Sequence, residues 1–391
     1  MTLKEDAALL LADLVRVRRA LHAEPEVGLD LPRTQAAILK ELDGLGLEII
    51  LGRASSSVVA VLHGAHPGPA VLLRADMDAL PLTEATRLPY ASTNGAMHAC
   101  GHDLHVAGLL GAARLLAARR ETIAGSVVFM FQPGEESGGG ALSMLAEGVL
   151  EAAGVPVSAA YGIHVMPGAP GVFSTRPGAL MAGANVLRIE VIGRGGHGSK
   201  PHDALDPVPV LAEIVLALQA FVTRRFDVFD PVVLTVTKLA ASEVLNVIPE
   251  SARLAATVRT LSDRSVEVLQ SELPVLAGRI AAAHGCAARV DFEAVYPVTV
   301  NDAASADRSL AVLRRQFGVE RVEPAASPMM ASEDFSFVLR EVPGAFVFLG
   351  ATPAQIAPAD AEMNHSPRAV FDDGILADHA AALAALALDH L

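Results

Sequence analysis

The chain has 391 residues, 52% of them hydrophobic and 19% charged, which excludes a disordered or fibrous protein. The net charge of −14, without any Lys or Arg block, argues against nucleic acid and anionic membranes as partners. The two cysteines are too few for a disulfide framework, and residues 1–22 are typical of an amphipathic helix rather than a signal peptide. We therefore expect a cytoplasmic globular protein of about two domains that acts on a small molecule.

Short apolar runs alternate with helical patterns after this first helix. The expected strands cover residues 58–62, 70–75, 127–131 and 159–165, and the clearest helical pattern covers 104–118. This alternation is typical of an α/β fold, in which helices pack on a sheet. The same rhythm returns near the C terminus, with a helix expected at 306–317, a strand at 345–349 and a helix from residue 373.

A stretch with a different pattern separates these two parts. It reads as strand, helix, two strands, helix and strand, at residues 185–192, 204–222, 231–240, 252–260, 265–283 and 287–295. The β-α-β-β-α-β order is that of a ferredoxin-like unit, which forms a complete small domain. We therefore predict an inserted α+β domain at 185–296, between the first part (1–184) and the last part (297–391) of one α/β domain.

Metal-binding residue types are densest in the segment MHACGHDLH, residues 97–105. Cys100 and His102 are two positions apart on a loop, and an irregular backbone can turn both side chains toward one ion. A single Cys or His is most often a buried thiol or a hydrogen-bonded imidazole, which is our interpretation of Cys286. Three histidines and a cysteine within eight residues, downstream of Asp76 and Asp78, are harder to explain by packing and predict a metal site.

Two adjacent carboxylates form a second candidate. The strand at 127–131 is followed by Pro133-Gly134 and then by Glu135 and Glu136, at the sheet edge where open α/β folds bind ligands. Neighbouring side chains on extended backbone diverge, so one Glu can bind a metal while the other reaches the attacking water. The ordinary alternative is a pair that interacts with a helix dipole. His164 and His365 are further candidate ligands, although either alone would more often be structural.

A glycine pattern at residues 193–198 fits the dinucleotide motif G-x-G-x-x-G. Pro201 and a polar turn separate it from the next helix, so its last glycine does not open a helix that could hold a pyrophosphate. Ser199-Lys200 also reverses the order that a P-loop requires. We therefore reject nucleotide binding here.

Six motifs occur in an order that resembles the M20 metallopeptidase family: MHACGHD, QPGEE, GIHV, GRGGHGS, NVIP and NHSP. They are most similar to the amidohydrolase branch, which includes hippurate hydrolases, indole-3-acetyl-amino-acid hydrolases and N-acyl-amino-acid amidohydrolases. The resemblance implies a zinc-peptidase-like, two-metal α/β catalytic domain with an inserted ferredoxin-like lid. It also implies two divalent ions per subunit, Zn²⁺ or Mn²⁺, or alternatively Co²⁺ or Ni²⁺.

The resemblance implies a role for each matching residue. Five would be metal ligands: Cys100, His102, Glu136, His164 and His365. Glu135 would be the catalytic carboxylate, and His197 in the lid would donate to the oxyanion. Asn246 and Arg259 would hold the free carboxylate of the substrate. Arg74-Ala75-Asp76 stands where other peptidases of the family have His-x-Asp, so Asp76 is expected to orient a ligand imidazole.

These residues predict a metal-dependent amidohydrolase that cleaves N-acyl or N-aroyl amino acids into a carboxylic acid and a free amino acid. A dipeptidase or carboxypeptidase of the same family and a metal-loaded binding protein without turnover remain as alternatives. Similar proteins dimerise through their lids, and the apolar helical segment at 211–222 is suited to such contacts. We therefore expect a homodimer or a dimer-based tetramer, with His197 acting either on its own chain or on the neighbouring one.

Overall fold

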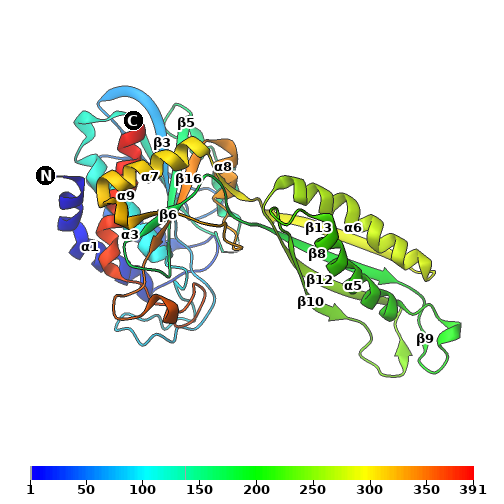
Figure 1. The fold of residues 1–391 in the computed structure, drawn as a ribbon. Coiled ribbons are helices and arrows are strands. Elements are labelled where there is room, and N and C mark those ends of the chain that lie inside the picture. The colour runs from blue at the N-terminus through cyan, green and yellow to red at the C-terminus, as the bar shows by residue number, and fades with distance from the viewer. Residues whose placement is uncertain (1, 137) are drawn as a thin grey trace. The chain divides into compact units, whose positions relative to one another are not determined.

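The computed structural model describes residues 2–136 and 138–391, which form two compact units (Figure 1). The first unit comprises Met1–Leu180, Val300–Ser327 and Asp334–Leu391, and the second comprises Met181–Thr299 with Pro328–Glu333. The second unit thus begins four residues before the predicted insertion at 185–296 and ends three residues after it. It also includes the short segment 328–333, for which the sequence pattern gave no indication.

An eight-stranded sheet forms the centre of the first unit, in the order β1-β2-β4-β3-β5-β16-β6-β15. The strands are β1 (Glu48–Leu51), β2 (Val58–His63), β3 (His66–Asp76), β4 (Ala124–Gln132), β5 (Val157–Met166), β6 (Phe173–Thr175), β15 (Val322–Pro324) and β16 (Gly344–Gly350). The neighbours β4, β3, β5 and β16 pair in parallel, so their C-terminal ends meet at one edge. The five strands predicted for this part of the chain are confirmed in β2, β3, β4, β5 and β16.

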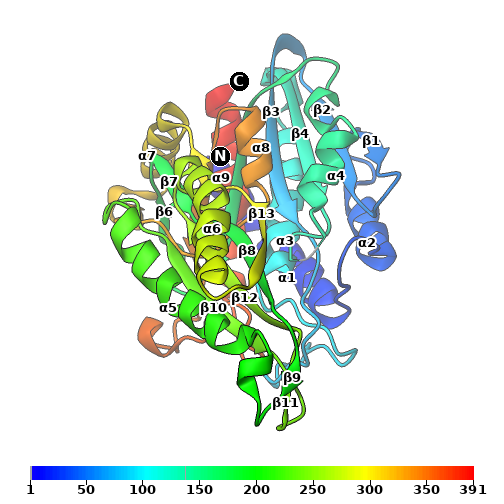
Figure 2. The ribbon, with the colours of Figure 1, turned by 90° about the vertical axis from the view of Figure 1, so that its right-hand side faces the viewer.

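Helices cover both faces of this sheet. They are α1 (Leu3–Ala23), α2 (Pro32–Leu42), α3 (His102–Ala117), α4 (Gly140–Ala146), α7 (Ala303–Phe317), α8 (Ser336–Glu341) and α9 (Leu376–His390). α3 packs between the sheet, α1 and α9, and Figure 2 shows α4 and α8 on the opposite face. α9 approaches α3 closely because Gly108 has no side chain: a Cβ there would lie 1.9 Å from His379 Nδ1. The predicted helices at 104–118, 306–317 and the C terminus are confirmed.

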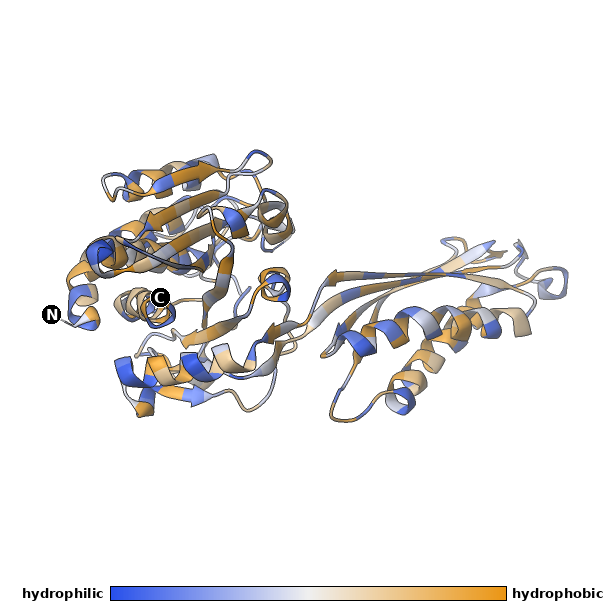
Figure 3. Ribbon diagram, turned by 90° about the horizontal axis from the view of Figure 1, so that it is seen from above, coloured by the Kyte–Doolittle hydropathy of each residue, from blue (hydrophilic) through white to orange (hydrophobic). Residues whose placement is uncertain are grey.

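The second unit has the predicted order of elements: β8 (Gly183–Ile192), α5 (Pro207–Arg225), β10 (Val233–Ala240), β12 (Ser251–Thr260), α6 (Asp263–Ala283) and β13 (Ala287–Tyr296). Its sheet order is β10-β12-β8-β13, and all neighbouring strands are antiparallel. Both helices cover one face of this sheet (Figure 3), because alternate residues of β12 are apolar and buried. β9 (Gly196–His197) and β11 (Val247–Ile248) form a short pair in this unit, and β7 (Gly178–Met181) pairs with β14 (Thr299–Asn301) where the chain passes from one unit to the other.

Within the described ranges, α5 is the one helix long and apolar enough to cross a membrane. Its buried residues Val210, Leu211, Ile214 and Leu218 recur at helical spacing and belong to the core between the helices and the sheet of the second unit. This packing explains why one side of α5 is apolar. Leu216, on another side, remains 72% exposed.

Candidate metal centre

The candidate metal ligands of the first unit lie where its parallel strands end. β3 ends at Asp76, β4 is followed by Glu135 and Glu136, and His164 lies near the end of β5. Because β4, β3 and β5 are neighbours in the sheet, these side chains share one edge. His102 begins α3 directly after the loop that carries Cys100, and this brings the remaining motif to the same place.

The predicted ligands form one continuous cluster of donor atoms. Cys100, Glu136 and His365 have ligand atoms within 4.8 Å of one another, and so do Asp76, His102, His105 and His164. Cys100 Sγ lies 3.5 Å from His164 Nε2 and therefore connects the two groups. Glu136 Oε1 lies 3.2 Å from His365 Nε2 and 3.8 Å from His102 Nε2. All five residues predicted as ligands are thus brought together in two groups, which contact each other through Cys100 and His164 and through Glu136 and His102.

The donor atoms fit a cation. In the part of the chain that the structure describes, His102 Nε2 and Glu136 Oε1 are buried, and their polar contacts are ion pairs within the cluster, to Asp76 and His365, rather than well-formed hydrogen bonds. Buried polar atoms are seldom left in this state, and two such atoms that face one cluster are expected where a metal ion binds. A thiolate, three imidazoles and a carboxylate are typical ligands of Zn²⁺ and similar divalent ions.

The ligand imidazoles are oriented for coordination through Nε2. His164 Nδ1 donates to the carbonyl of Val165 at 2.8 Å, and His102 Nδ1 donates to the carbonyl of Asp78 at 2.9 Å. In each ring the proton is therefore on Nδ1, and Nε2 is left for a metal. Burial holds the pKa of His164 well below its usual range, which keeps this imidazole in the neutral form that binds metals.

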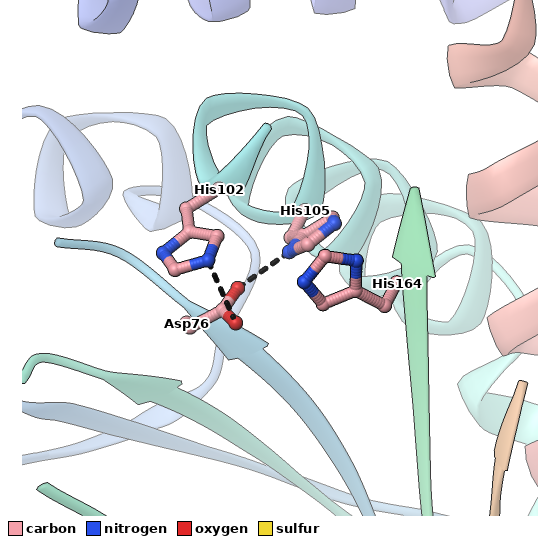
Figure 4. A group of neighbouring side chains, drawn as sticks. All are labelled: Asp76, His102, His105 and His164. Carbon is pink, nitrogen blue, oxygen red and sulfur yellow. Dashed lines mark hydrogen bonds and ion pairs between the residues drawn. The ribbon is translucent and has the colours of Figure 1, made fainter. Parts of the chain in front are cut away.

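Asp76, which is expected to orient a ligand imidazole, contacts two histidine rings of the cluster. Its Oδ1 accepts from His105 Nδ1 at 2.5 Å, and its Oδ2 lies 3.3 Å from His102 Nε2 (Figure 4). The ring of His102 is also oriented by Asp78, because that residue's carbonyl holds Nδ1. Burial alone would raise the pKa of Asp76, but the charge of Arg74, 2.8 Å away, holds it well below its usual range.

His105 lies within the cluster but has no nitrogen left for a metal. Its Nδ1 donates to Asp76, and its Nε2 accepts the backbone N–H of Val165 at 2.9 Å. A metal would have to displace one of these two buried hydrogen bonds. His105 therefore supports the segment that carries His164, although sequence spacing alone could not separate it from a ligand.

The sequence placed Asp78 near the metal-binding segment but indicated no role for it, and the structure shows that it is fully buried beside the cluster. Its carboxylate accepts the backbone N–H groups of Glu135 at 3.0 Å and Glu136 at 3.1 Å, while its own carbonyl holds His102. One residue thus positions a ligand imidazole and the backbone of both glutamates. The available signal was the second acidic residue of the run Asp76-Met77-Asp78, directly after a buried strand.

The side chains of Glu135 and Glu136 have different surroundings, as their adjacent positions predict. Glu136 contacts the two imidazoles, whereas Glu135 Oε1 lies 3.4 Å from the backbone nitrogen of Asp334. Gln132 Nε2 donates to both carboxylate oxygens of Asp334, at 2.7 and 2.8 Å. Arg74 bridges Gln132 and Asp334 at 2.9 and 3.1 Å. This buried network supports the end of β4, and sequence reasoning did not identify Asp334.

The predicted substrate residues lie in the second unit. His197 on β9 is exposed, and its Nδ1 accepts from Ser199 N at 3.1 Å and contacts Ser199 Oγ at 2.9 Å. Asn246 is close by, because its carbonyl accepts from Gly198 N at 2.8 Å. Arg259 lies near the other end of β12, and the strand from residue 251 to 259 spans about 27 Å. A single unit therefore brings His197 and Asn246 together but leaves Arg259 apart.

Comparisons with known proteins identify the family of this chain. Peptidase family M20/M25/M40 matches residues 72–389. Thermostable carboxypeptidase 1 of Saccharolobus solfataricus is 35% identical, over 99% of this chain and 97% of its own. IAA-amino acid hydrolase ILR1-like 4 of Arabidopsis thaliana is 36% identical, over 97% and 86%. The solved structure of Bacillus subtilis YXEP, described as a dinuclear metal binding peptidase from the M20 family, is similar with a TM-score of 0.86, 31% identity and 98% coverage of both chains. The chain therefore belongs to peptidase family M20/M25/M40, as its six motifs predicted, and is a metal-dependent hydrolase of that family.

Proposed function

We propose that the protein hydrolyses the amide bond of N-acyl or N-aroyl amino acids, such as hippurate, to a carboxylic acid and a free amino acid. The observation that carries this proposal is that Glu135 and Glu136 both come within 4.8 Å of a His102 nitrogen, while Glu136 also faces His365 and Glu135 faces the backbone nitrogen of Asp334. In this proposal Glu136 binds a metal and Glu135 moves a proton. The name of one relative, IAA-amino acid hydrolase, describes cleavage of the same class of bond.

We propose two divalent ions as cofactors, held by Cys100, His102, Glu136, His164 and His365. Zn²⁺ or Mn²⁺ suits these ligands, with Co²⁺ or Ni²⁺ as alternatives. When bound, the ions supply Lewis acidity that activates water and polarises the scissile carbonyl. Glu135 then takes a proton from the attacking water and returns it to the departing amine, a role typically worth about 10²- to 10⁴-fold in rate.

His197 is proposed to stabilise the oxyanion. The backbone N–H of Ser199 can only donate, so Nδ1 of His197 must accept, and the neutral ring carries its proton on Nε2. This exposed N–H is available to donate to a developing negative charge. Ser199 thus sets the tautomer that the role requires.

Arg259 is proposed to hold the free carboxylate of the substrate. Within the described ranges, its hydrogen bonds go to Thr257 Oγ1 and the carbonyl of Val258, and it forms no ion pair. Partial burial lowers its pKa but leaves the guanidinium charged. A half-buried cation without a protein carboxylate is suited to bind one from a ligand.

The distance along β12 favours two subunits per active site. His197 and Asn246 lie together, but about 27 Å of strand separates their end of the unit from Arg259. A small substrate cannot span that length, so joint action requires one set of residues from each of two chains. We therefore propose a homodimer, either alone or within a tetramer, with His197 acting in trans.

Subunit mixing tests the dimer. Inactive His197→Ala and inactive Glu135→Gln chains, refolded together, should form heterodimers with one intact site and recover part of the activity. Recovery of no activity, despite heterodimers demonstrated by differential tags, would contradict action in trans.

The hydrolysis itself is tested by metal-dependent release of glycine from hippurate, compared with cleavage of an unblocked dipeptide. Faster cleavage of hippurate is the expected result. Preference for the dipeptide would instead support a dipeptidase or carboxypeptidase, and one relative is named a carboxypeptidase. Stoichiometric metal without turnover of either compound would indicate a binding protein.

A further inference from the structure

The side-chain amide of Asn364 lies among three segments that carry candidate ligands. Its Nδ2 is 3.2 Å from the carbonyl of Val165, 3.4 Å from the carbonyl of Cys100 and 3.4 Å from Cys100 Sγ. Both carbonyls can only accept hydrogen bonds, so the amide must present its NH₂ group to them. The same choice places an N–H donor beside the sulfur atom, at a distance suitable for an N–H···S hydrogen bond.

The residue that follows Asn364 has an unusual backbone. His365, a predicted ligand, has φ of 72°, and in the described ranges Arg87 is the one other non-glycine residue with positive φ. Such a conformation is unfavourable for a residue with a side chain and persists only when several contacts enforce it. His365 N donates to the carbonyl of Ala99 at 3.0 Å. The residue after Ala99 is Cys100, whose carbonyl and Sγ both lie 3.4 Å from the Asn364 amide nitrogen, so one N–H of that amide is shared between them while the other faces Val165.

The Asn364 amide also reaches the segment of a third ligand. The Val165 carbonyl that accepts from Asn364 accepts from His164 Nδ1 as well, at 2.8 Å. One amide group, on the residue that precedes His365, therefore contacts both the backbone that orients His164 and the thiol of Cys100. Metal ligands depend on such neighbouring hydrogen bonds for their orientation and donor strength.

We propose that Asn364 is a positioning residue, which holds Cys100 and His365 at ligand distance and donates an N–H to the Cys100 sulfur. The proposal rests on the proposed function in one respect, namely that Cys100 binds a metal. It adds a residue that contacts the sulfur without being a ligand itself. An N–H donor stabilises the lone pairs of a thiolate, so its removal should change both the position of the sulfur and its electronic state.

Co²⁺ is a suitable probe because a bound thiolate gives a charge-transfer absorption whose energy follows the sulfur lone pairs. We would load wild type, Asn364→Ala and Asn364→Asp with Co²⁺ and record this band together with Co²⁺ affinity. The band should shift to lower energy in the Ala variant and further in the Asp variant, which places a carboxylate beside the sulfur. Affinity for Co²⁺ should fall by about 10- to 100-fold in both.

Asn94→Ala is the matched control, because Asn94 makes a comparable bond between distant loops, from Nδ2 to the carbonyl of Pro25 at 2.8 Å. This variant should bind Co²⁺ and absorb as wild type does. Circular dichroism of the metal-free proteins checks folding, and the nearly isosteric Asn364→Asp decides the question if the Ala variant does not fold.

Two negative results are distinguishable. A Co²⁺-loaded wild type without a thiolate band would overturn the assignment of Cys100 as a ligand, and this inference with it. A normal band in wild type that is unchanged in folded Asn364 variants, with unchanged affinity, would overturn the inference and leave the proposed function intact.

Discussion

Exchanging each of the adjacent glutamates for glutamine should separate catalysis from metal binding. Glu135→Gln is expected to fold, retain its metal and lose nearly all turnover, because an amide keeps the shape of the side chain but cannot accept a proton from water. Glu136→Gln is expected to lose metal as well, because a neutral amide replaces the carboxylate that faces two imidazoles, 3.2 and 3.8 Å away.

The structure sets the size of the two effects. In Glu135→Gln the backbone bond to Asp78 at 3.0 Å remains, and Oε1 can still face Asp334 N, so stability should change little. Because this variant cannot transfer the proton, its kcat should fall by about 10²- to 10⁴-fold. Glu136 Oε1 is buried and its neighbours within the described ranges are imidazoles of the cluster, so a neutral amide there loses the charge that attracts a metal and gains no new contact to offset this loss.

The assay combines metal analysis of the purified protein by mass spectrometry with the rate of hippurate hydrolysis. Glu147→Gln is a matched control, because the Glu147 carboxylate accepts the backbone N–H groups of Arg53 and Ala54 and touches no candidate ligand. It should keep both metal and activity. Equal metal loss in the Glu135 and Glu136 variants would refute the division of roles between them.

Three further predictions concern other parts of the first unit. Asp78→Asn should fold and bind metal but lose about 10- to 100-fold in kcat, since an amide cannot accept both backbone N–H groups at once and the loss of a charge-assisted bond costs about 1.5–3 kcal/mol; an unchanged kcat in steady-state kinetics would contradict this. Alkylation of Cys100 in the metal-free enzyme should prevent later activation by added metal. The Cys286→Ser variant should still be alkylated and inactivated as wild type is, because it retains Cys100. Full metal content and activity in Cys100→Ser would exclude the thiolate as a ligand. Burial lowers the pKa of His379 from 6.5 to about 3. Between these pH values the imidazole binds a proton in the unfolded chain but not in the folded chain, so the free energy of unfolding falls as the pH drops from about 6.5 to about 3. In His379→Gln the unfolding free energy of the metal-free protein, measured by urea denaturation, should therefore depend less on pH over this range. An unchanged pH dependence would refute the lowered pKa of His379 as its cause.

Much of the fold and most of the metal cluster could be predicted from the sequence, for local reasons. Apolar residues with a period of two or about 3.6 mark a strand or a helix wherever that face is buried, which is why the main strands and helices of both units were predicted, whereas short elements such as β1, β6, β15 and α4 were not. Cys100 and His102 are two residues apart, and Glu135 and Glu136 follow directly on a buried strand. Spacing of this kind is visible without any knowledge of distant contacts.

Other features depended on contacts between residues far apart in the chain. Asp334 meets Gln132 from 202 positions away, and Asn364 meets Cys100 from 264 positions away. Neither contact leaves a local pattern, because a buried hydrogen bond depends on where two chain segments meet in space. Tertiary structure also decided between similar residues, since His105 and His102 begin the same helix and differ only in whether both ring nitrogens are already bonded. A sequence reports which donor atoms a segment can offer, but the fold decides which of them remain available to a metal.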